Sequence, residues 1–449
     1  MTPGAPASDL IVPVPMRALV VTALIAGVLI RIAILPIAVP AVDDSWRAWS
    51  FHAATRGPWN LYGGKGHTVA FAGIDAPVVY PPLALDEFAL IGRAHLARTG
   101  GRFDDDVALT RTIKSSIALL DAARTALIFF AVRRAGGTAR AWWAATAYWL
   151  NPAVLMITTL GYVDVFMAIP AVGGLIAAWA GRSWLTGALV AAAIMTKPQA
   201  ALIAPAAALA LWNAGGAAGR TRLREAVTGG AITCGIIVAP LVAAGTLYYM
   251  ARSVAVLARH DMLSALAFNL WWLVGYACSV AAARADGLRA ALLAEPGVVT
   301  QGFAMAQGLP NPRAIAAVLL AVPVLWALKT AASTRDLGLQ AALAAFITMA
   351  YFTLSVQVHE NHFFMALPLL AIAAALRPAF APVAAVWSVT SALNLYLTFG
   401  TRGETPSEFW RTITVVDSSI PVAVVTCMVF VWFGREFAHA CAQTRDEPG

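Results

Sequence analysis

The sequence predicts an all-α integral membrane protein, a polytopic bundle of about twelve transmembrane helices. Of its 449 residues, 60% are hydrophobic and only 12% are charged, and the mean hydropathy is +0.73. Soluble domains are about 45 to 50% apolar and about 25% charged, so water is not the main solvent of this chain. Apolar runs of about 17 to 25 residues recur along it, and each can cross a bilayer. We therefore expect one continuous membrane domain over residues 1–449.

The spans follow from these apolar runs. The first run is longer than the apolar core of a signal peptide and lacks a small-residue cleavage site, so we expect it to be retained as a span. The predicted spans are residues 17–40, 114–132, 141–160, 165–181, 184–196, 200–213, 226–247, 313–329, 339–356, 363–376, 379–398 and 419–434.

Positive residues predict the orientation, because Lys and Arg accumulate in short cytoplasmic loops. In the twelve-span count they fall on one side, which places both termini in the cytoplasm and the protein in the cell (inner) membrane. The opposite, outer face then carries residues 41–111, 248–312 and 400–418. The amphipathic stretches 46–61 and 264–276 suit helices that lie in the membrane interface. The residues that carry this orientation are Arg17, Arg133, Arg134, Arg140, Arg182, Arg220, Arg222, Arg224, Lys329, Arg335, Arg377 and Arg435.

Composition also excludes several classes of function. The net charge of +8 is spread in single and paired residues between the apolar runs, which is typical of topology signals and not of a nucleic-acid surface. The four cysteines have neither CxxC nor zinc spacing, so the sequence supports no disulfide framework and no thiolate metal site. It contains no phosphate-binding P-loop, GxSxG or SxxK motif, so nucleotide hydrolysis and serine acylation lack support.

Asp43 and Asp44 follow directly after the first span, at the predicted outer membrane surface. Two adjacent carboxylates repel each other, which favours proton uptake and suits a general base. The alternative is that the pair only marks the membrane boundary.

The residues around this pair form a recognisable series that ends in Tyr80, Pro81 and Pro82. The stretch Asp-Asp-Ser-Trp-Arg-Ala-Trp at 43–49 is followed by Gly-Pro-Trp-Asn-Leu-Tyr at 57–62 and by Val-Tyr-Pro-Pro-Leu at 79–83. This series resembles the first outer loop of GT-C glycosyltransferases, particularly their bacterial mannosyltransferase-like branch. The resemblance continues in order through Asp121, Asn151-Pro152, Gly161 to Asp164, Lys197-Pro198-Gln199 and His359-Glu360.

The resemblance implies a GT-C-like bundle and a lipid-linked sugar donor. It also implies that an acidic residue in the first outer loop takes part in catalysis. Asp44 matches the family position slightly better than Asp43, so Asp44 is the first candidate for the base. The sequence departs from the family pattern at two positions. Tyr162 stands where Gln is typical, and Asn361 stands where a basic or aromatic residue is common.

The candidate donor-binding residues lie at the same predicted membrane boundary, although they are far apart in sequence. A polyprenyl-phosphate sugar places its phosphate at the headgroup level, where cationic donors stabilise the charge that leaves with the phosphate. Lys197 and His359 suit that task, whereas the alternative for Lys197 is a side chain that only reaches toward headgroups. The other donor-site candidates are Gln199, Glu360 and Tyr80, and candidates for acceptor binding or support are Asp164, His362 and Asn269.

Other readings of the polar residues are weaker. His359 and His362 are three apart and share a helix face, but this is not zincin spacing, so we expect no metal and no cofactor. Asp121 and Arg124 are also three apart, and mutual pairing within the second span predicts a structural role. The acidic run 104–106 is typical of a solvated surface. The Trp pair at 271–272 is typical of a membrane–water interface.

We therefore expect an inverting transfer of a hexose, mannose by preference, from polyprenyl phosphate to a lipid-linked or periplasmic acceptor hydroxyl. The partners are that donor, the glycan acceptor and membrane lipids, with no nucleic acid. One alternative is a lipid-linked sugar flippase or secondary transporter, which would place polar residues at the bilayer midplane. Another is an inactive homologue that acts as a scaffold in cell-envelope assembly.

Overall fold

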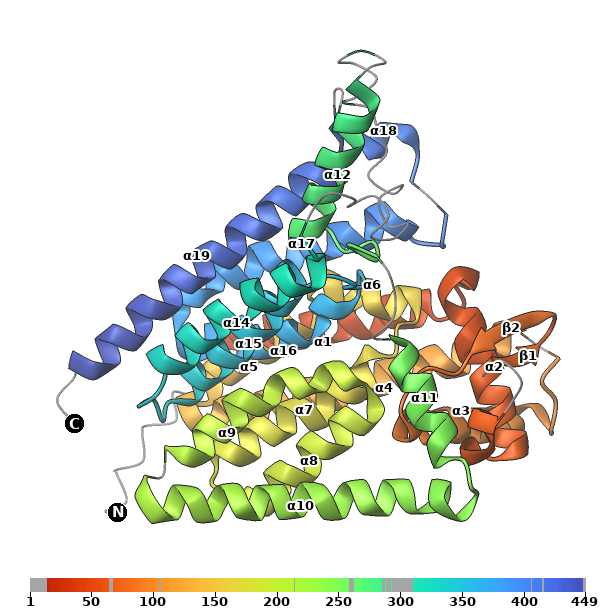
Figure 1. Cartoon of the computed structure of the whole chain (residues 1–449), viewed down its shortest axis with the longest axis horizontal. Helices are drawn as coiled ribbons and strands as arrows, with labels where there is room; N and C mark the ends of the chain where they lie inside the picture. The colour runs from red at the N-terminus through yellow and green to blue at the C-terminus, as the bar shows by residue number, and fades with distance from the viewer. Residues whose placement is uncertain are drawn as a thin grey trace.

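The described part of the chain is a helical bundle with two small β-hairpins, and Figure 1 shows the arrangement of its helices. The computed structural model describes residues 14–63, 68–104, 106–213, 215–257, 262–284, 287, 292, 310–404, 406–413 and 416–446. Much of the predicted outer loop 248–312 therefore lies outside the described residues, and the side chain of Asp43 lies outside them as well.

Seven helices among the described residues are long and apolar enough to cross a membrane. Five shorter apolar helices accompany them, so the structure supports a polytopic bundle and leaves the count of about twelve spans open. The long helices are α1 (Val14–Ile34), α4 (Asp106–Gly136), α10 (Gly216–Ala243), α14 (Pro312–Thr330), α15 (Leu337–Leu354), α17 (Ala381–Phe399) and α19 (Ser419–Asp446). The shorter helices include α7 (Asp164–Trp179), α8 (Ser183–Thr196), α9 (Ala204–Trp212), α12 (Leu270–Ala283) and α16 (Ala366–Leu376).

Prolines set several of the helix boundaries. The predicted span 141–160 consists of two helices, α5 (Thr138–Trp149) and α6 (Pro152–Leu160). Pro152 disfavours helical geometry at the residue before it, so the chain breaks there and Asn151 caps α6 by accepting from the Ala153 amide at 2.9 Å. Pro198 acts similarly after α8, where the short 3-10 helix η3 (Pro198–Ile203) leads into α9.

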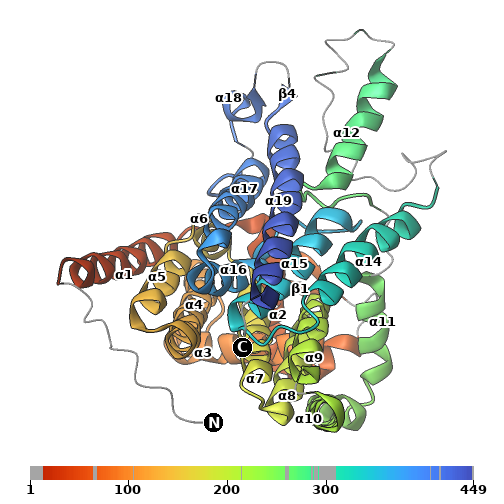
Figure 2. The same ribbon diagram turned by 90° about the vertical axis from the view of Figure 1, so that its left-hand side faces the viewer.

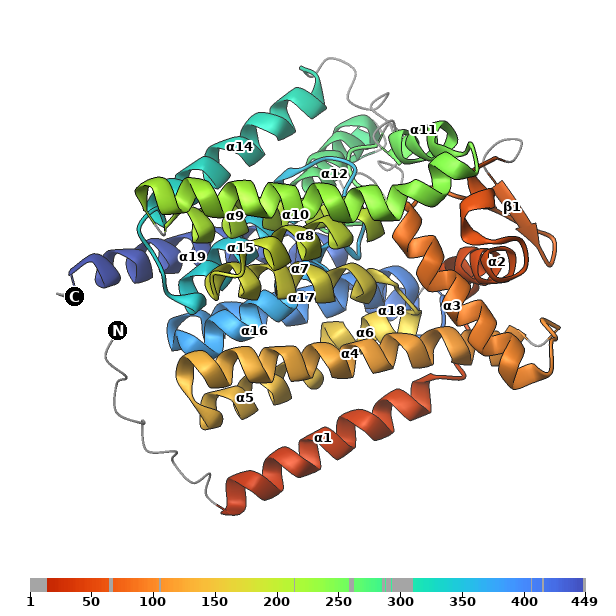
Figure 3. The same cartoon turned by 90° about the horizontal axis from the view of Figure 1, so that it is seen from below.

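Burial divides the bundle into a centre and a lipid-facing rim. In α15, 89% of the most apolar window is buried, whereas only 17% is buried in α1 and 11% in both α10 and α14. Figures 2 and 3 show α1 and α10 along opposite edges of the bundle. Large apolar side chains such as Leu29 on α1 and Ile236 on α10 are exposed there, which suits contact with lipid.

The first predicted outer loop is folded. It contains α2 (Pro40–Arg56), the 3-10 helix η1 (Pro58–Gly63), the hairpin β1 (Thr68–Phe71) and β2 (Ile74–Pro77), and α3 (Pro82–Thr99). Phe71 pairs with Ile74 at the turn of this antiparallel hairpin. These elements gather at one end of the bundle, and α1 begins and α19 ends at the opposite end (Figures 1 and 3). We call the end that carries α2 and α3, where α7 begins and α8 ends, the site end.

The remaining elements join these helices. They are α11 (Leu247–Leu257), the 3-10 helices η7 (His362–Met365) and η8 (Pro378–Phe380), the short helix α18 (Glu408–Arg411), and the hairpin β3 (Thr412–Ile413) and β4 (Val416–Asp417). Figure 1 shows α12 and α18 extending beyond the bundle on the same side.

The orientation is tested by topology reporters. A reporter fused after Arg224 or Arg335 should read as cytoplasmic, and one inserted at Ala72, between β1 and β2, should read as external, because positive residues resist translocation. Paired phosphatase and fluorescent-protein fusions provide the measurement. An external signal at Arg335 would contradict an outward-facing site end.

Candidate active site

A buried ion pair lies at the centre of the site end. The Lys197 ammonium donates to Asp164 Oδ1 at 2.6 Å, and both side chains are almost fully buried. Burial alone lowers the pKa of the Lys197 amine, but the Asp164 carboxylate and the Tyr80 phenol raise it, so the net direction is upward. Lys197 therefore stays charged. The Asp164 carboxylate balances this charge where no water can do so.

Local backbone geometry brings the two residues together. Gly161 ends α6 in the left-handed region, with φ of 82°, so the chain reverses within a few residues and α7 begins at Asp164. A carboxylate in the first turn of a helix is also stabilised by the helix dipole. Lys197 is extended, with φ of −153°, because Pro198 disfavours a helical residue before it. The start of α7 and the end of α8 thus meet.

Asn361 completes this pair from a third segment. Its amide nitrogen donates to Asp164 Oδ2 at 2.7 Å, so both carboxylate oxygens accept hydrogen bonds. Asn361 lies in the connection between α15 and η7. The central group of the site is therefore Lys197, Asp164 and Asn361, and it joins three parts of the chain.

Glu360, next to Asn361, is buried and bonded to Tyr162. The Tyr162 hydroxyl donates to Glu360 Oε1. Burial raises the pKa of the Glu360 carboxyl to about 7, although the hydrogen bond from Tyr162 and the charge of Lys197 act in the opposite direction. The pKa of Tyr162 is raised by burial and then by the nearby Glu360 carboxylate. Glu360 can therefore change its charge near neutral pH.

The two predicted histidines differ in exposure. The His359 side chain is 41% exposed, and its Nδ1 lies 3.8 Å from Glu360 Oε2. His362 is buried, and its Nδ1 accepts from the His359 backbone amide at 3.3 Å. Its Nε2 lies 3.2 Å from the amide nitrogen of Gln199. In the neutral ring Nε2 then carries the proton, so the Gln199 oxygen is the better acceptor in that contact. His359 is the histidine that a substrate can reach.

The described residues show no group of three His, Cys, Asp or Glu side chains that could hold a metal ion. The expectation that the site uses no metal stays a prediction.

Tyr80 connects the ion pair to the folded first loop. The Lys197 ammonium lies 5.5 Å from the centre of the half-buried Tyr80 ring. The Trp46 and Trp49 rings of α2 lie 5.6 and 5.2 Å from the same ring. The Tyr62 hydroxyl donates to the Tyr80 carbonyl at 2.7 Å and fixes the segment before α3. We call Tyr80, Trp46 and Trp49 the aromatic wall, and Lys197 approaches it through Tyr80.

Asp44 lies in the first turns of α2, where Arg47 donates to its Oδ1 at 2.6 Å. Arg47 also lies 3.4 Å from Asp106 at the start of α4. No hydrogen bond or ion pair among the described side chains joins Asp44 to the Asp164–Lys197 pair. The predicted repulsion between Asp43 and Asp44 stays a prediction, because the side chain of Asp43 lies outside the described residues.

Asn269 has a structural position. It is fully buried, caps α12 by accepting from the Trp271 and Trp272 amides, and donates to the Phe352 carbonyl at 2.9 Å. Asn394 of α17 holds the same segment through the Leu266 carbonyl. The backbone of this segment in turn contacts the connection that carries His359 and Glu360, because the Ala265 amide donates to the Val358 carbonyl at 2.9 Å.

The structure therefore brings together most of the predicted site. Lys197, Gln199, Tyr80, Asp164, His359, Glu360 and His362 form one cluster, Asn269 supports it, and Asp44 lies on the adjoining α2. Sequence analysis missed the contacts of Tyr162, Asn361 and Arg47. Tyr162 and Asn361 are the two positions at which the sequence departs from the GT-C pattern, and this departure was the signal in the sequence that could have pointed to them.

No protein-family model and no curated protein matches this chain, whereas some solved structures are similar to it. The oligosaccharyltransferase AglB from Archaeoglobus fulgidus, in complex with an inhibitory peptide and a dolichol-phosphate, is 14% identical with a TM-score of 0.43, and the match covers 94% of this chain and 56% of AglB. ArnT from Cupriavidus metallidurans, in the apo state, is 14% identical with a TM-score of 0.42, and the match covers 95% of this chain and 78% of ArnT.

This chain thus spans little more than half the length of the archaeal enzyme. At this identity and TM-score, the likeness assigns neither a family nor an activity, and the function rests on the site residues.

The raised pKa of Glu360 predicts a pH-dependent stability. Because its folded-state pKa of about 7 lies above the ordinary value of 4.5, folding favours the protonated carboxyl. This preference contributes about 3 kcal/mol to the free energy of unfolding. The contribution is fully present below pH of about 4.5 and is lost as the pH rises through about 7. Relative to Glu360→Gln, the wild type should therefore lose thermal stability between pH 5 and 8. Thermal unfolding in detergent measures this, with Glu408→Gln on the exposed helix α18 as the matched control. A stability difference that is constant over this range would contradict the burial of an ionisable Glu360.

Proposed function

We propose that this protein is a membrane-embedded glycosyltransferase that uses a polyprenyl-phosphate sugar. It transfers a hexose, mannose by preference, to a lipid-linked or periplasmic acceptor hydroxyl, with inversion at the anomeric carbon. The reaction takes place at the outer face of the cell (inner) membrane, and both termini are cytoplasmic. The donor, the glycan acceptor and membrane lipids are its partners.

The observation that carries this proposal is the cluster of ionisable groups at the site end. Lys197, Asp164 and Glu360 are buried together beside the accessible His359. Ionisable groups at membrane depth are costly, so they are functional candidates by default. A cationic group beside an aromatic wall, at the level where a bundle meets the headgroups, suits a phosphate with a lipid tail on one side and a sugar on the other.

The exposure of each group suggests its role. His359 contacts the donor phosphate directly, because its ring is the reachable one. Lys197 is buried and contributes positive charge while Asp164 holds it in place. Gln199, Glu360 and Tyr80 bind the sugar or phosphate, and Asp164, His362 and Asn269 support these residues.

The chemistry is a direct displacement. The acceptor oxygen attacks the anomeric carbon, and the bond from that carbon to the phosphate oxygen breaks with its electron pair moving to the phosphate. The acceptor proton passes to a carboxylate of α2, Asp44 or its neighbour Asp43. Such a base must lie within hydrogen-bond reach of the hydroxyl. Asp44 is half-buried and on the same element as the two Trp side chains of the aromatic wall, which supports this assignment.

A flippase or secondary transporter is the main rival, and it would place polar groups along a path at the bilayer midplane. Arg31, Asp121 and Arg124 do lie inside the spans, but their side chains are at most 3% exposed and are bonded to one another. A mutually satisfied buried group favours a structural role over a transport path.

Loss of the reachable histidine should reduce turnover. His359→Ala should lower turnover with a polyprenyl-phosphate donor by about ten-fold to a thousand-fold, the scale for removing a charge-stabilising donor. Lys197→Ala should do the same, and it should also lower stability because Asp164 is left as a buried unpaired charge. Single-turnover kinetics on folded protein provide the measurement.

The matched control for these variants is His439→Ala, an exposed histidine near the end of α19. It should behave as the parent. Parental kinetics in both His359→Ala and Lys197→Ala would contradict the proposal that the donor phosphate binds at this site.

The α2 carboxylates are tested by amide variants, which keep the side-chain shape and remove its ability to accept a proton. Asp44→Asn should lower turnover about a hundred-fold to ten-thousand-fold while donor binding survives, and Asp43→Asn should retain substantial activity. Binding and turnover are measured together in nanodiscs. Asp104→Asn, an exposed carboxylate of the same loop, is the matched control.

Arg47→Met separates two roles for Asp44. If Asp44 only orients Arg47, then Arg47→Met and Asp44→Asn should be equally impaired. If Asp44 is the base, Arg47→Met should retain more activity. Parental turnover in both Asn variants and in the double variant would rule out proton transfer to α2.

A further inference from the structure

The turn between α6 and α7 carries two residues of the site, Tyr162 and Asp164. We call residues 159–165 the Tyr162 turn. The last carbonyls of a helix have no partner within it. At the end of α6, the Ile157 carbonyl accepts from the Gly161 and Tyr162 amides, each at 3.0 Å. The next carbonyls, and the orientation of the turn, depend on groups from elsewhere.

Lys114 of α4 supplies one of these groups. It is fully buried, and its ammonium donates to the Thr159 carbonyl at the start of the Tyr162 turn. The same ammonium donates to the Ile37 carbonyl, in the connection between α1 and α2. One cation thus holds the Tyr162 turn against the connection that leads into α2.

Arg124 of α4 supplies the second group, at the other end of the turn. It is fully buried, and its guanidinium donates to the Val165 carbonyl at 3.0 Å. The guanidinium carbon also lies 4.8 Å from the centre of the Phe364 ring, in η7 directly after Glu360 and Asn361. Arg124 therefore contacts both segments that meet at the Asp164–Asn361 hydrogen bond.

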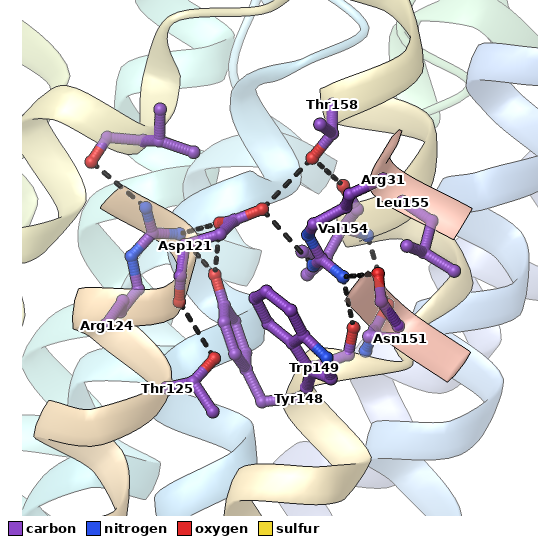
Figure 4. A network of polar contacts seen from close by, with 12 residues as sticks. Arg31, Asp121, Arg124, Thr125, Tyr148, Trp149, Asn151, Val154, Leu155 and Thr158 are labelled. Carbon is purple, nitrogen blue, oxygen red and sulfur yellow. Dashed lines mark hydrogen bonds and ion pairs between the residues drawn. The ribbon is translucent and has the colours of Figure 1, made fainter. Parts of the chain in front are cut away.

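Asp121 fixes Arg124 within a network that Figure 4 shows. Asp121 lies 3.4 Å from Arg124 and accepts from Tyr148 at 3.2 Å. It also accepts from Thr158, the residue before the turn, at 3.0 Å. Arg31 of α1 pairs with the same carboxylate at 3.4 Å, but its other bonds go to the Trp149 and Gly27 carbonyls, away from the turn.

We propose that Lys114 and Arg124 are positioning residues of the active site: from inside the bundle they fix the turn that presents Tyr162 to Glu360 and Asp164 to Lys197. This inference rests on the proposed function for its catalytic part. Buried charges are often no more stabilising than apolar side chains of the same volume. Because Lys114 and Arg124 contact the two ends of one turn, we infer that their role is to hold the site residues on that turn in position.

The test uses the full-length protein in nanodiscs and two measurements. The variants are Lys114→Met, Arg124→Met and Arg124→Lys, since the lysine keeps a charge for Asp121 but lacks the fork that also reaches Val165. The matched control is Arg31→Met, which removes a buried arginine from the same carboxylate but no contact with the turn. Hydrogen exchange of residues 158–166 is compared with that of the central helix α15.

We expect exchange in the turn to become about ten-fold faster in the Lys114 and Arg124 variants and to stay parental in Arg31→Met, with α15 unchanged in all. Turnover should fall about ten-fold to a hundred-fold with little change in KM, because misplacing a site by about 1 Å costs on this scale. The groups that face the Glu360 carboxyl are Tyr162, Lys197, Asp164 and His359. A displaced turn weakens the contact of Tyr162 with this carboxyl. The pH profile of turnover in the Lys114 and Arg124 variants should therefore shift in the same direction as it does in Tyr162→Phe.

Equal loosening of the turn and α15, or the same effect in Arg31→Met, would overturn the inference in favour of a general stabilising role. Parental exchange in the turn in the Lys114 and Arg124 variants would also overturn it. If the parent transfers no sugar, the proposed function fails, and the exchange measurement alone decides whether these cations fix the turn.

Discussion

The buried contact between Lys197 and Asp164 is the interaction on which the site depends. It joins the start of α7 to the end of α8, and Asn361 adds the connection after α15. Removing one partner of such a pair commonly costs about 3 to 5 kcal/mol, because the other is left charged and buried. The pair therefore fixes geometry as well as charge. His359 and Glu360 stand beside it because Asn361, the next residue, is bonded to Asp164.

The membrane explains why so many polar groups are bonded inside this bundle. Helices in lipid must satisfy their polar groups internally, because no water is available to replace a missing partner. Lys114 and Arg124 use main-chain carbonyls as acceptors, and the same bonds connect the interior to the site. The bonds that satisfy these buried cations therefore also contact the turn of the candidate site. The first predicted outer loop adds the other half of the site, since its aromatic wall meets Lys197 through Tyr80.

Sequence predicted the class of fold well, because it depends on local composition, whereas the side of the membrane that the site faces stays a prediction. Apolar length indicates spans, and counting spans placed Lys197, Asp164 and His359 at one boundary. The pairing of individual side chains was less accessible, since it depends on packing between residues far apart in sequence. Asp44 is the clearest case, because its bond to Arg47, one helical turn away, was not among the contacts expected from sequence. Tyr162 and Asn361 were visible only as unusual residues until their contacts were known.

A transfer assay shows directly whether this site takes sugar from a polyprenyl-phosphate carrier. Purified protein in nanodiscs is given a panel of polyprenyl-phosphate hexoses, each labelled in the sugar, with a lipid extract as acceptor. We expect label in a new product, free polyprenyl phosphate in equal amount, and a preference for mannose within the panel. Unchanged donors across the whole panel, with folded protein and with every acceptor fraction, would contradict the proposed function.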